Sequence, residues 1–79
     1  MQFTLKMPKL GDTAESVVIV QCYRSVGDSL VAGEPLFRVE TDKVEVDVEA
    51  AMGGTLVAIL VEEGAEISTG TPIAIVGEP

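Results

Sequence analysis

One lysine stands alone among acidic residues near the middle of the chain. Between residues 39 and 49 the sequence reads VETDKVEVDVE, so Lys43 is surrounded by five carboxylates and by apolar residues or threonine. The chain has two further lysines, Lys6 and Lys9. A lysine at a tight turn between two strands keeps its ammonium in water, where a modifying enzyme can acylate it. The pattern therefore predicts that Lys43 is an attachment point, with no catalytic role of its own.

A two-residue turn at Asp42-Lys43 also sets the register of the hairpin behind it. The predicted cross-strand pairs are Thr41 with Val44, Val39 with Val46, Phe37 with Val48, Arg38 with Asp47, and Glu40 with Glu45. The apolar pairs share one face, which should close on the core. Glu40 opposite Glu45 is a like-charge pair that needs screening by water. We therefore expect the end of this hairpin to lie outside the fold.

Composition and charge exclude several classes of function. A chain of 79 residues forms one domain with a modest core, so we do not expect a complete enzyme. The formal charge of −8 repels nucleic acid and anionic membranes, and no apolar run is long enough to span a membrane. The start of the chain lacks a signal or transit pattern, so we expect a cytoplasmic domain in a bacterium or one in the mitochondrial matrix.

The content of histidine and cysteine also limits the chemistry that the chain can perform. The chain has no histidine, which removes the usual general base and the imidazole metal ligand, and no metal site is predicted. Cys22 is the only cysteine, so no internal disulfide can form. Its neighbours are valines and an isoleucine, which indicates a packing residue in a half-buried strand.

The chain contains an internal duplication. Residues 17–40 align with residues 54–77 at an offset of 37, and glycine, proline and aliphatic positions coincide. The matched pairs are Gly27 with Gly64, Leu30 with Ile67, Gly33 with Gly70, Pro35 with Pro72, Leu36 with Ile73, and Val39 with Val76. Glycine permits turn conformations and proline is tolerated where a strand begins, so both halves should share one geometry. The duplication predicts pseudo-twofold symmetry.

The hydrophobic pattern predicts an all-β fold. Strand-like segments cover residues 3–7, 17–23, 35–41, 44–49, 55–61 and 72–76, and no segment shows a sustained helical period. Residues 28–32 and 65–69 are long enough only for a brief strand or turn. Short strands separated by Gly and Pro turns indicate two small sheets packed face to face or a flattened barrel.

The residues Glu40-Thr41-Asp42-Lys43-Val44, in the middle of a duplicated chain, resemble the lipoyl domains of 2-oxo acid dehydrogenase complexes. The resemblance also covers residues 7–11, 26–30 and 54–56. It implies a barrel-sandwich hybrid, a flattened β-barrel of two four-stranded antiparallel sheets, with lipoic acid in amide linkage to Lys43. It further implies that residues 1–79 form a single lipoyl domain, the N-terminal part of a longer acyltransferase chain.

The resemblance implies a carrier. Lipoamide on Lys43 would act as a swinging arm between a thiamine-diphosphate-dependent decarboxylase, an acyltransferase core and dihydrolipoamide dehydrogenase, in a 2-oxo acid or acetoin dehydrogenase complex. A lipoate ligase or a lipoyl/octanoyl transferase would attach the group. We expect the isolated domain to be a monomer. The residues expected to be recognised, with loop 10–15 beside them, are Glu40, Thr41, Asp42, Val44 and Glu45.

Two alternatives remain open. A biotin carboxyl carrier domain shares the fold but places its lysine between methionines, whereas Lys43 lies between Asp42 and Val44. An unmodified lipoyl-like structural adaptor would have no use for an exposed lysine at a tight turn. The sequence does not indicate whether the substrate is pyruvate, 2-oxoglutarate, a branched-chain 2-oxo acid or acetoin.

Overall fold

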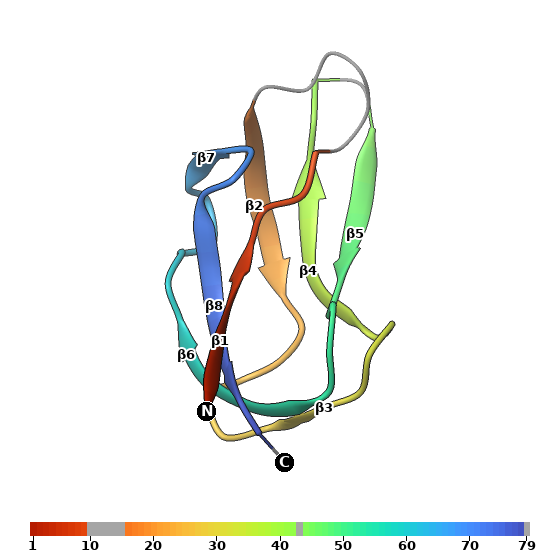
Figure 1. Cartoon of the computed structure of the whole chain (residues 1–79). Helices are drawn as coiled ribbons and strands as arrows, with labels where there is room; N and C mark the ends of the chain where they lie inside the picture. The colour runs from red at the N-terminus through yellow and green to blue at the C-terminus, as the bar shows by residue number, and fades with distance from the viewer. Residues whose placement is uncertain (10–15, 43, 79) are drawn as a thin grey trace.

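The computed structural model describes residues 1–9, 16–42 and 44–78, and these residues form eight strands (Figure 1). The strands are β1 (Gln2–Lys6), β2 (Ser16–Cys22), β3 (Ser29–Leu30), β4 (Pro35–Glu40), β5 (Glu45–Glu49), β6 (Gly54–Ile59), β7 (Glu66–Ser68) and β8 (Pro72–Gly77). No helix occurs in these three segments, and so none that could cross a membrane. The six longer strands match the predicted segments to within two residues at each end, and the two short segments form β3 and β7.

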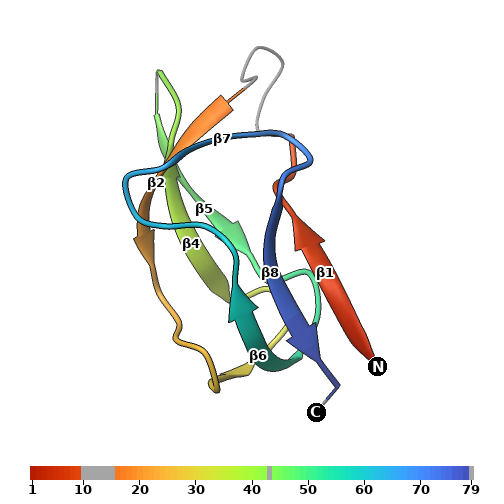
Figure 2. The same cartoon turned by 90° about the vertical axis from the view of Figure 1, so that its left-hand side faces the viewer.

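The strands form two antiparallel sheets of four strands each. One sheet has the order β1-β8-β6-β3 and the other the order β5-β4-β2-β7. Figure 2 shows β1, β8 and β6 in one layer and β2, β4 and β5 in the layer facing it. The predicted all-β, flattened barrel-sandwich of two four-stranded sheets is confirmed.

The two sheets are related by the internal duplication. An offset of 37 carries β2, β3 and β4 onto β6, β7 and β8, and an offset of 43 carries β1 onto β5. Single backbone bonds repeat as well: the Gly27 N–H donates to the Leu56 carbonyl at 2.7 Å, and the Gly64 N–H donates to the Ile19 carbonyl at 2.6 Å. The two glycines have φ angles of 99° and 90°, which other residues rarely adopt. The pseudo-twofold symmetry predicted from sequence is therefore present in the backbone.

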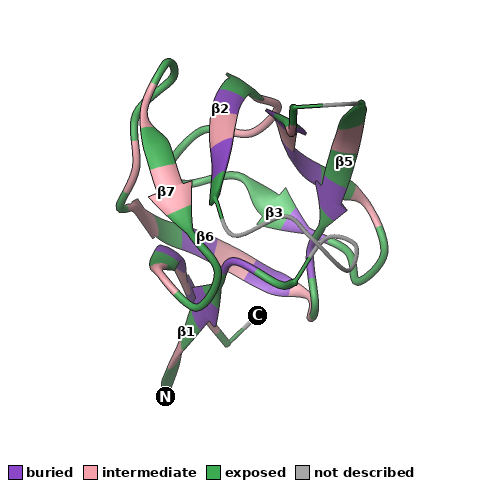
Figure 3. Ribbon diagram, turned by 90° about the horizontal axis from the view of Figure 1, so that it is seen from above, coloured by how far each residue is buried: buried purple, intermediate pink, exposed green. Residues whose placement is uncertain are grey.

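The core lies between the sheets and takes residues from both halves of the chain. Figure 3 shows buried residues on strands of both sheets. The buried apolar residues are Leu5, Met7, Val17, Ile19, Leu30, Leu36, Phe37, Val39, Val48, Ala50, Leu56, Ile73, Ala74 and Val76. Within the described segments no polar or charged residue is buried. Burial of these side chains is the main stabilising contribution to a domain of this size.

The domain is elongated, with principal extents of 35 × 19 × 19 Å. The end of the β4–β5 hairpin lies at one end of the long axis, and both chain termini lie at the other (Figure 1). A group attached to the hairpin end would therefore stand far from the points at which the chain enters and leaves the domain.

Candidate functional site

The predicted attachment turn closes the β4–β5 hairpin. Lys43 itself lies outside the described residues, so its side chain is not placed. The residues on either side of it, Asp42 and Val44, are exposed, and the side chain of Val44 is 56% exposed although it is apolar. The residues on both sides of Lys43 are thus exposed, as the sequence predicts for the end of the hairpin.

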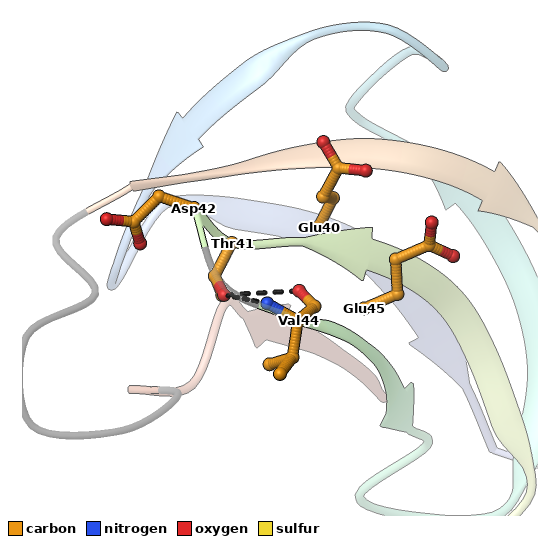
Figure 4. Close-up of a pocket in the computed structure, with 5 residues that line it drawn as sticks. All are labelled: Glu40, Thr41, Asp42, Val44 and Glu45. Atoms are coloured by element: carbon orange, nitrogen blue, oxygen red, sulfur yellow. Dashed lines mark hydrogen bonds between the residues drawn. The ribbon is translucent and has the colours of Figure 1, made fainter.

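The predicted register of the hairpin is confirmed in every pair. The ladder aligns Phe37 with Val48, Arg38 with Asp47, Val39 with Val46 and Glu40 with Glu45. Beyond the last pair, the Thr41 N–H donates to the Val44 carbonyl at 2.8 Å. Glu40 and Glu45 direct their carboxylates to the same side of the hairpin (Figure 4). Both glutamates are exposed, so water screens their repulsion.

The five predicted recognition residues come together around the turn. Glu40, Thr41, Asp42, Val44 and Glu45 line one open, polar hollow of about 430 Å³ (Figure 4). The other predicted part of the recognition surface, loop 10–15, lies outside the described residues. The structure therefore assembles the hairpin part of the predicted site from residues adjacent in sequence.

The side chain of Thr41 closes the turn. Its hydroxyl Oγ1 lies 3.1 Å from the Val44 N–H and 3.1 Å from the Val44 carbonyl, so it accepts a hydrogen bond from one and donates to the other. Figure 4 shows both contacts. Thr41 is half-buried, unlike the exposed Asp42 and Val44. One threonine side chain thus binds both backbone polar groups of the residue that follows Lys43.

Arg38 neutralises part of the acidic hairpin. Its Nε donates to Glu45 Oε1 at 2.6 Å, and its Nη1 lies 3.4 Å from Asp47 Oδ1. The Tyr23 hydroxyl donates to the same Asp47 oxygen at 2.9 Å. The hydrogen bond to Glu45 is the main cause that raises the pKa of Arg38, with a further contribution from Tyr23.

Sequence analysis predicted Arg38 opposite Asp47 but missed its shorter bond to Glu45 and the contribution of Tyr23. Glu45 lies two residues before Asp47 on the same face of β5, within reach of a long side chain on β4. That spacing could have indicated the diagonal contact. Among the described residues, Glu40 and Asp42 form no ion pair, whereas Glu45 and Asp47 are paired with Arg38.

Three acidic residues lie in one row across the sheet that contains the hairpin. The row consists of Glu45, Glu40, Val18 and Glu66, on β5, β4, β2 and β7. The symmetry-related row of the other sheet consists of Gln2, Gly77, Thr55 and Ser29. The same backbone arrangement thus occurs once with three carboxylates and once with none. Glu40 and Glu45 lie directly opposite each other, and like charges in that position are destabilising, so this pair does not serve to stabilise the sheet.

One carboxyl with a shifted pKa lies away from the turn. Glu34 precedes β4; its Oε1 accepts the Val31 N–H at 2.7 Å and its Oε2 pairs with Arg24 Nη2 at 2.7 Å. The backbone hydrogen bond, more than the guanidinium, lowers the pKa of Glu34. Its contacts are within its own turn and with the strand connection, which indicates a structural role.

The remaining candidate residues have ordinary environments. Cys22 is half-buried against the core, with its Sγ 2.9 Å from the Arg24 carbonyl, as expected of a packing residue. Lys6 and Lys9 are exposed. In the part of the chain that the structure describes, no three metal-ligating side chains form a group that could hold a metal ion.

Comparison with known proteins identifies the family. The biotin/lipoyl family model, described as "Biotin-requiring enzyme", matches residues 3–76. The chain belongs to this family. A pyruvate dehydrogenase complex dihydrolipoyllysine-residue acetyltransferase component of Corynebacterium glutamicum is 37% identical over 78 residues, covering 99% of this chain and 12% of that protein. The resemblance to lipoyl domains is thereby confirmed.

Relatives of this biotin/lipoyl domain belong to several complexes. A chloroplastic pyruvate dehydrogenase acetyltransferase component of Arabidopsis thaliana is 43% identical over 72 residues, covering 91% of this chain and 16% of that protein. The acetyltransferase component of the acetoin cleaving system of Bacillus subtilis is 35% identical over 78 residues, covering 99% and 20%. The chain thus spans an eighth to a fifth of the length of these relatives.

Solved structures share the fold. The lipoyl domain of the 2-oxoglutarate dehydrogenase complex of Azotobacter vinelandii matches with a TM-score of 0.75 and 23% identity, covering 95% of both chains. A single-chain long-chain acyl-CoA carboxylase matches with a TM-score of 0.79 and 20% identity, covering 99% of this chain and 7% of that one. At these sequence identities the two matches establish the fold of the biotin/lipoyl domain. They do not determine which group is attached to it.

Proposed function

We propose that this domain is a lipoyl carrier in which Lys43 bears lipoic acid through an amide bond. The observation that supports the proposal is the β4–β5 hairpin, whose ladder ends at Glu40 and Glu45 and whose next described residues around the turn, Asp42 and Val44, are exposed. The relatives named as dihydrolipoyllysine-residue acyltransferase components support lipoate as the attached group.

The geometry of the turn fits a covalent group that must reach into other proteins. Asp42 and Val44 on either side are exposed, and the surrounding hollow is open and polar. An enclosed pocket would hold the group against its own domain. An open hairpin end leaves the group accessible to a modifying enzyme and to distant active sites.

The chain's residues would serve to present the group. The β4–β5 ladder and the bonds between Thr41 and Val44 hold together the two strands that lead into and out of the turn, and the core face of the hairpin anchors them to the domain. Bound in amide linkage, lipoic acid would supply a dithiolane able to carry acyl groups and reducing equivalents between a thiamine-diphosphate-dependent decarboxylase, an acyltransferase core and dihydrolipoamide dehydrogenase. Tethering raises the effective concentration of that group at each active site.

The hairpin residues would also identify the domain to its partners. Glu40 and Asp42 keep their charge uncompensated by any described cation, whereas Glu45 is paired with Arg38. A partner with a basic surface around its active-site entrance would meet these carboxylates first, and complementary charge speeds association. We therefore assign Glu40 and Asp42 the larger electrostatic part in recognition, with Thr41, Val44 and Glu45 completing the contact surface.

The relatives also support a larger parent protein. Because this chain spans a small fraction of their lengths, we propose that it acts as one domain of a dihydrolipoyllysine-residue acyltransferase. In that setting the domain makes and breaks no bonds itself, and the isolated domain is a monomer. The relatives serve both pyruvate and acetoin systems, so the acyl substrate is left open.

Mass spectrometry tests the attachment site. The domain is incubated with a purified lipoate ligase, lipoate and ATP, and intact mass followed by peptide mapping locates the added group. We expect one lipoyl group on Lys43, none on Lys43→Arg, and full modification of the matched controls Lys6→Arg and Lys9→Arg. A lipoyl group on Lys9, or one retained by Lys43→Arg, would show that the site is wrong.

The position of the lysine is tested separately. Exchanging Asp42 and Lys43 moves the amine by one place while keeping the composition of the turn. We expect this variant to fold and to lose lipoylation.

Parallel incubation with a biotin ligase and biotin tests the alternative group that the family description allows. Biotin on Lys43, with no lipoyl group acquired from the lipoate ligase, would replace lipoate by biotin in the proposal.

A further inference from the structure

The turn that carries Lys43 is closed by a side chain. In a hairpin with a two-residue turn, the residues before and after the turn usually exchange two backbone hydrogen bonds. Here the Thr41 N–H makes one such bond to the Val44 carbonyl at 2.8 Å. The Val44 N–H instead lies 3.1 Å from Thr41 Oγ1. A hydroxyl thus takes the place of a carbonyl in the last link of the hairpin.

The same hydroxyl also bonds the Val44 carbonyl, at 3.1 Å (Figure 4). Both backbone polar groups of Val44 are therefore tied to one oxygen. Thr41 is half-buried at the base of the turn, and its β-branched side chain has few rotamers. This link fixes the chain immediately before and after Asp42 and Lys43 at little entropic cost.

We infer that Thr41 is a positioning residue for modification of Lys43. The inference rests on the proposed function, which it deepens. A modifying enzyme must bind the turn in one conformation, and a turn that adopts it only part of the time binds more weakly by the populated fraction. The Thr41 hydroxyl keeps that fraction high. Its removal should therefore raise KM and leave kcat unchanged, because a saturating enzyme still selects the competent conformation.

Thr41→Val is the informative variant, since valine keeps the β-branched shape and replaces the hydroxyl by a methyl. Thr41→Ser restores the hydroxyl without the methyl. Thr69→Val is a matched control, because Thr69 is an exposed threonine after β7 whose side chain makes no hydrogen bond to any described residue. All variants are assayed well below their melting temperatures.

The assay is the initial rate of lipoylation by a purified lipoate ligase at varied domain concentration. Losing a neutral hydrogen bond shifts an equilibrium by about fivefold to tenfold. Because KM varies inversely with the populated fraction and that fraction is high in the wild type, we expect Thr41→Val to raise KM by about twofold to fivefold, less than the shift in the equilibrium, with kcat unchanged. Thr69→Val should match the wild type, and Thr41→Ser, which keeps the hydroxyl, should reverse most of the rise in KM. Amide hydrogen exchange should be faster at Val44 in Thr41→Val and unchanged along β4.

Two results would overturn the inference. One is a wild-type KM in Thr41→Val despite faster exchange at Val44, which would show that closing the turn has no bearing on modification. The other is a rise in KM for Thr41→Ser equal to that of Thr41→Val, which would show that the hydroxyl is not responsible. If the wild type acquires no lipoyl group on Lys43, the proposed function fails and this inference fails with it. If the wild type is lipoylated and Thr41→Val matches it, only this inference fails.

Discussion

Gly54→Ala should be among the most destabilising single substitutions in this domain. Gly54 begins β6 with a φ of 148°, and a Cβ atom there would lie 2.2 Å from the Gly77 carbonyl oxygen and 2.8 Å from Val76 Cγ1. The first neighbour is backbone, so the clash can be relieved only by shifting β8. Overpacking of this kind costs about 1–3 kcal/mol, and backbone strain at a positive φ adds about 1–2 kcal/mol.

The expected loss is therefore about 2–5 kcal/mol, out of a total of roughly 4–12 kcal/mol for a domain of this length. Gly64→Ala is the matched control, because Gly64 also has a positive φ, of 90°, but a Cβ there would meet no atom within 4 Å. It should lose only the strain contribution of about 1–2 kcal/mol. Urea unfolding of both variants beside the wild type measures the difference.

Equal destabilisation of the two variants would refute the reasoning, since it would mean that β8 yields to the added methyl at no cost.

The clash lies at the end of the domain that holds the termini, far from the β4–β5 turn (Figure 1). We therefore expect folded Gly54→Ala to be lipoylated normally at a temperature below its melting transition. A loss of modification in folded protein would show that the two ends are coupled.

Three further outcomes test the scaffold, the charge and the pH response. Val46→Ala, which trims a half-buried side chain, should lower the free energy of unfolding by about 1 kcal/mol, whereas Lys43→Ala should change it by less than about 0.5 kcal/mol; urea titration checks both. On fully lipoylated domain, Glu40→Gln should slow reductive acylation by a decarboxylase more than Glu45→Gln, whose carboxylate is already paired, and the difference should shrink across a salt series. A rate insensitive to both changes would assign recognition to shape. The pKa of Glu34 is lower in the folded state, so its ionised form stabilises the fold above about pH 4.3. That stabilisation is lost as the pH falls through the folded-state pKa. Glu34→Gln should therefore make the melting temperature depend less on pH below about 4.3, which thermal melts across an acid pH series check.

The register of the central hairpin could be predicted because two independent features of the sequence agree. Turn length fixes which residues face each other, and the alternation from Phe37 to Val39 and from Val46 to Val48 fixes which face is buried. A shift of one residue would have placed Arg38 in the core. Few registers satisfy both conditions, so local sequence is sufficient at this point.

The bulges in the paired strands could not be predicted in the same way. Val20 in β2 and Val57 in β6 are extra residues at which the register shifts, and both are more than a third exposed. Each lies in a continuous apolar run, where alternation gives no signal. The equivalence of β1 and β5 was also missed, because its offset is 43 and the repeat visible in the sequence has an offset of 37.

The side-chain contacts of the site were only partly predictable. Sequence placed Arg38 opposite Asp47, but which of two nearby carboxylates a long side chain binds depends on torsions and strand twist. The bonds from Thr41 depend likewise on one rotamer at the turn. The sequence indicates which residues lie near the turn, but their hydrogen-bond partners follow only from the three-dimensional structure.

The internal duplication allows the residues at the end of the β4–β5 hairpin to be compared with their counterparts in the other sheet. Glu40 and Glu45 occupy positions whose counterparts in the other sheet are Gly77 and Gln2, and both sheets pair in the same register. Because the row without carboxylates has the same strand pairing, the pairing itself does not depend on carboxylates at these positions. They impose repulsion that Arg38 offsets on only one strand. Carboxylates that the other sheet lacks, at the strand ends that flank the Asp42-Lys43 turn, are consistent with the proposal that a partner recognises this end of the domain.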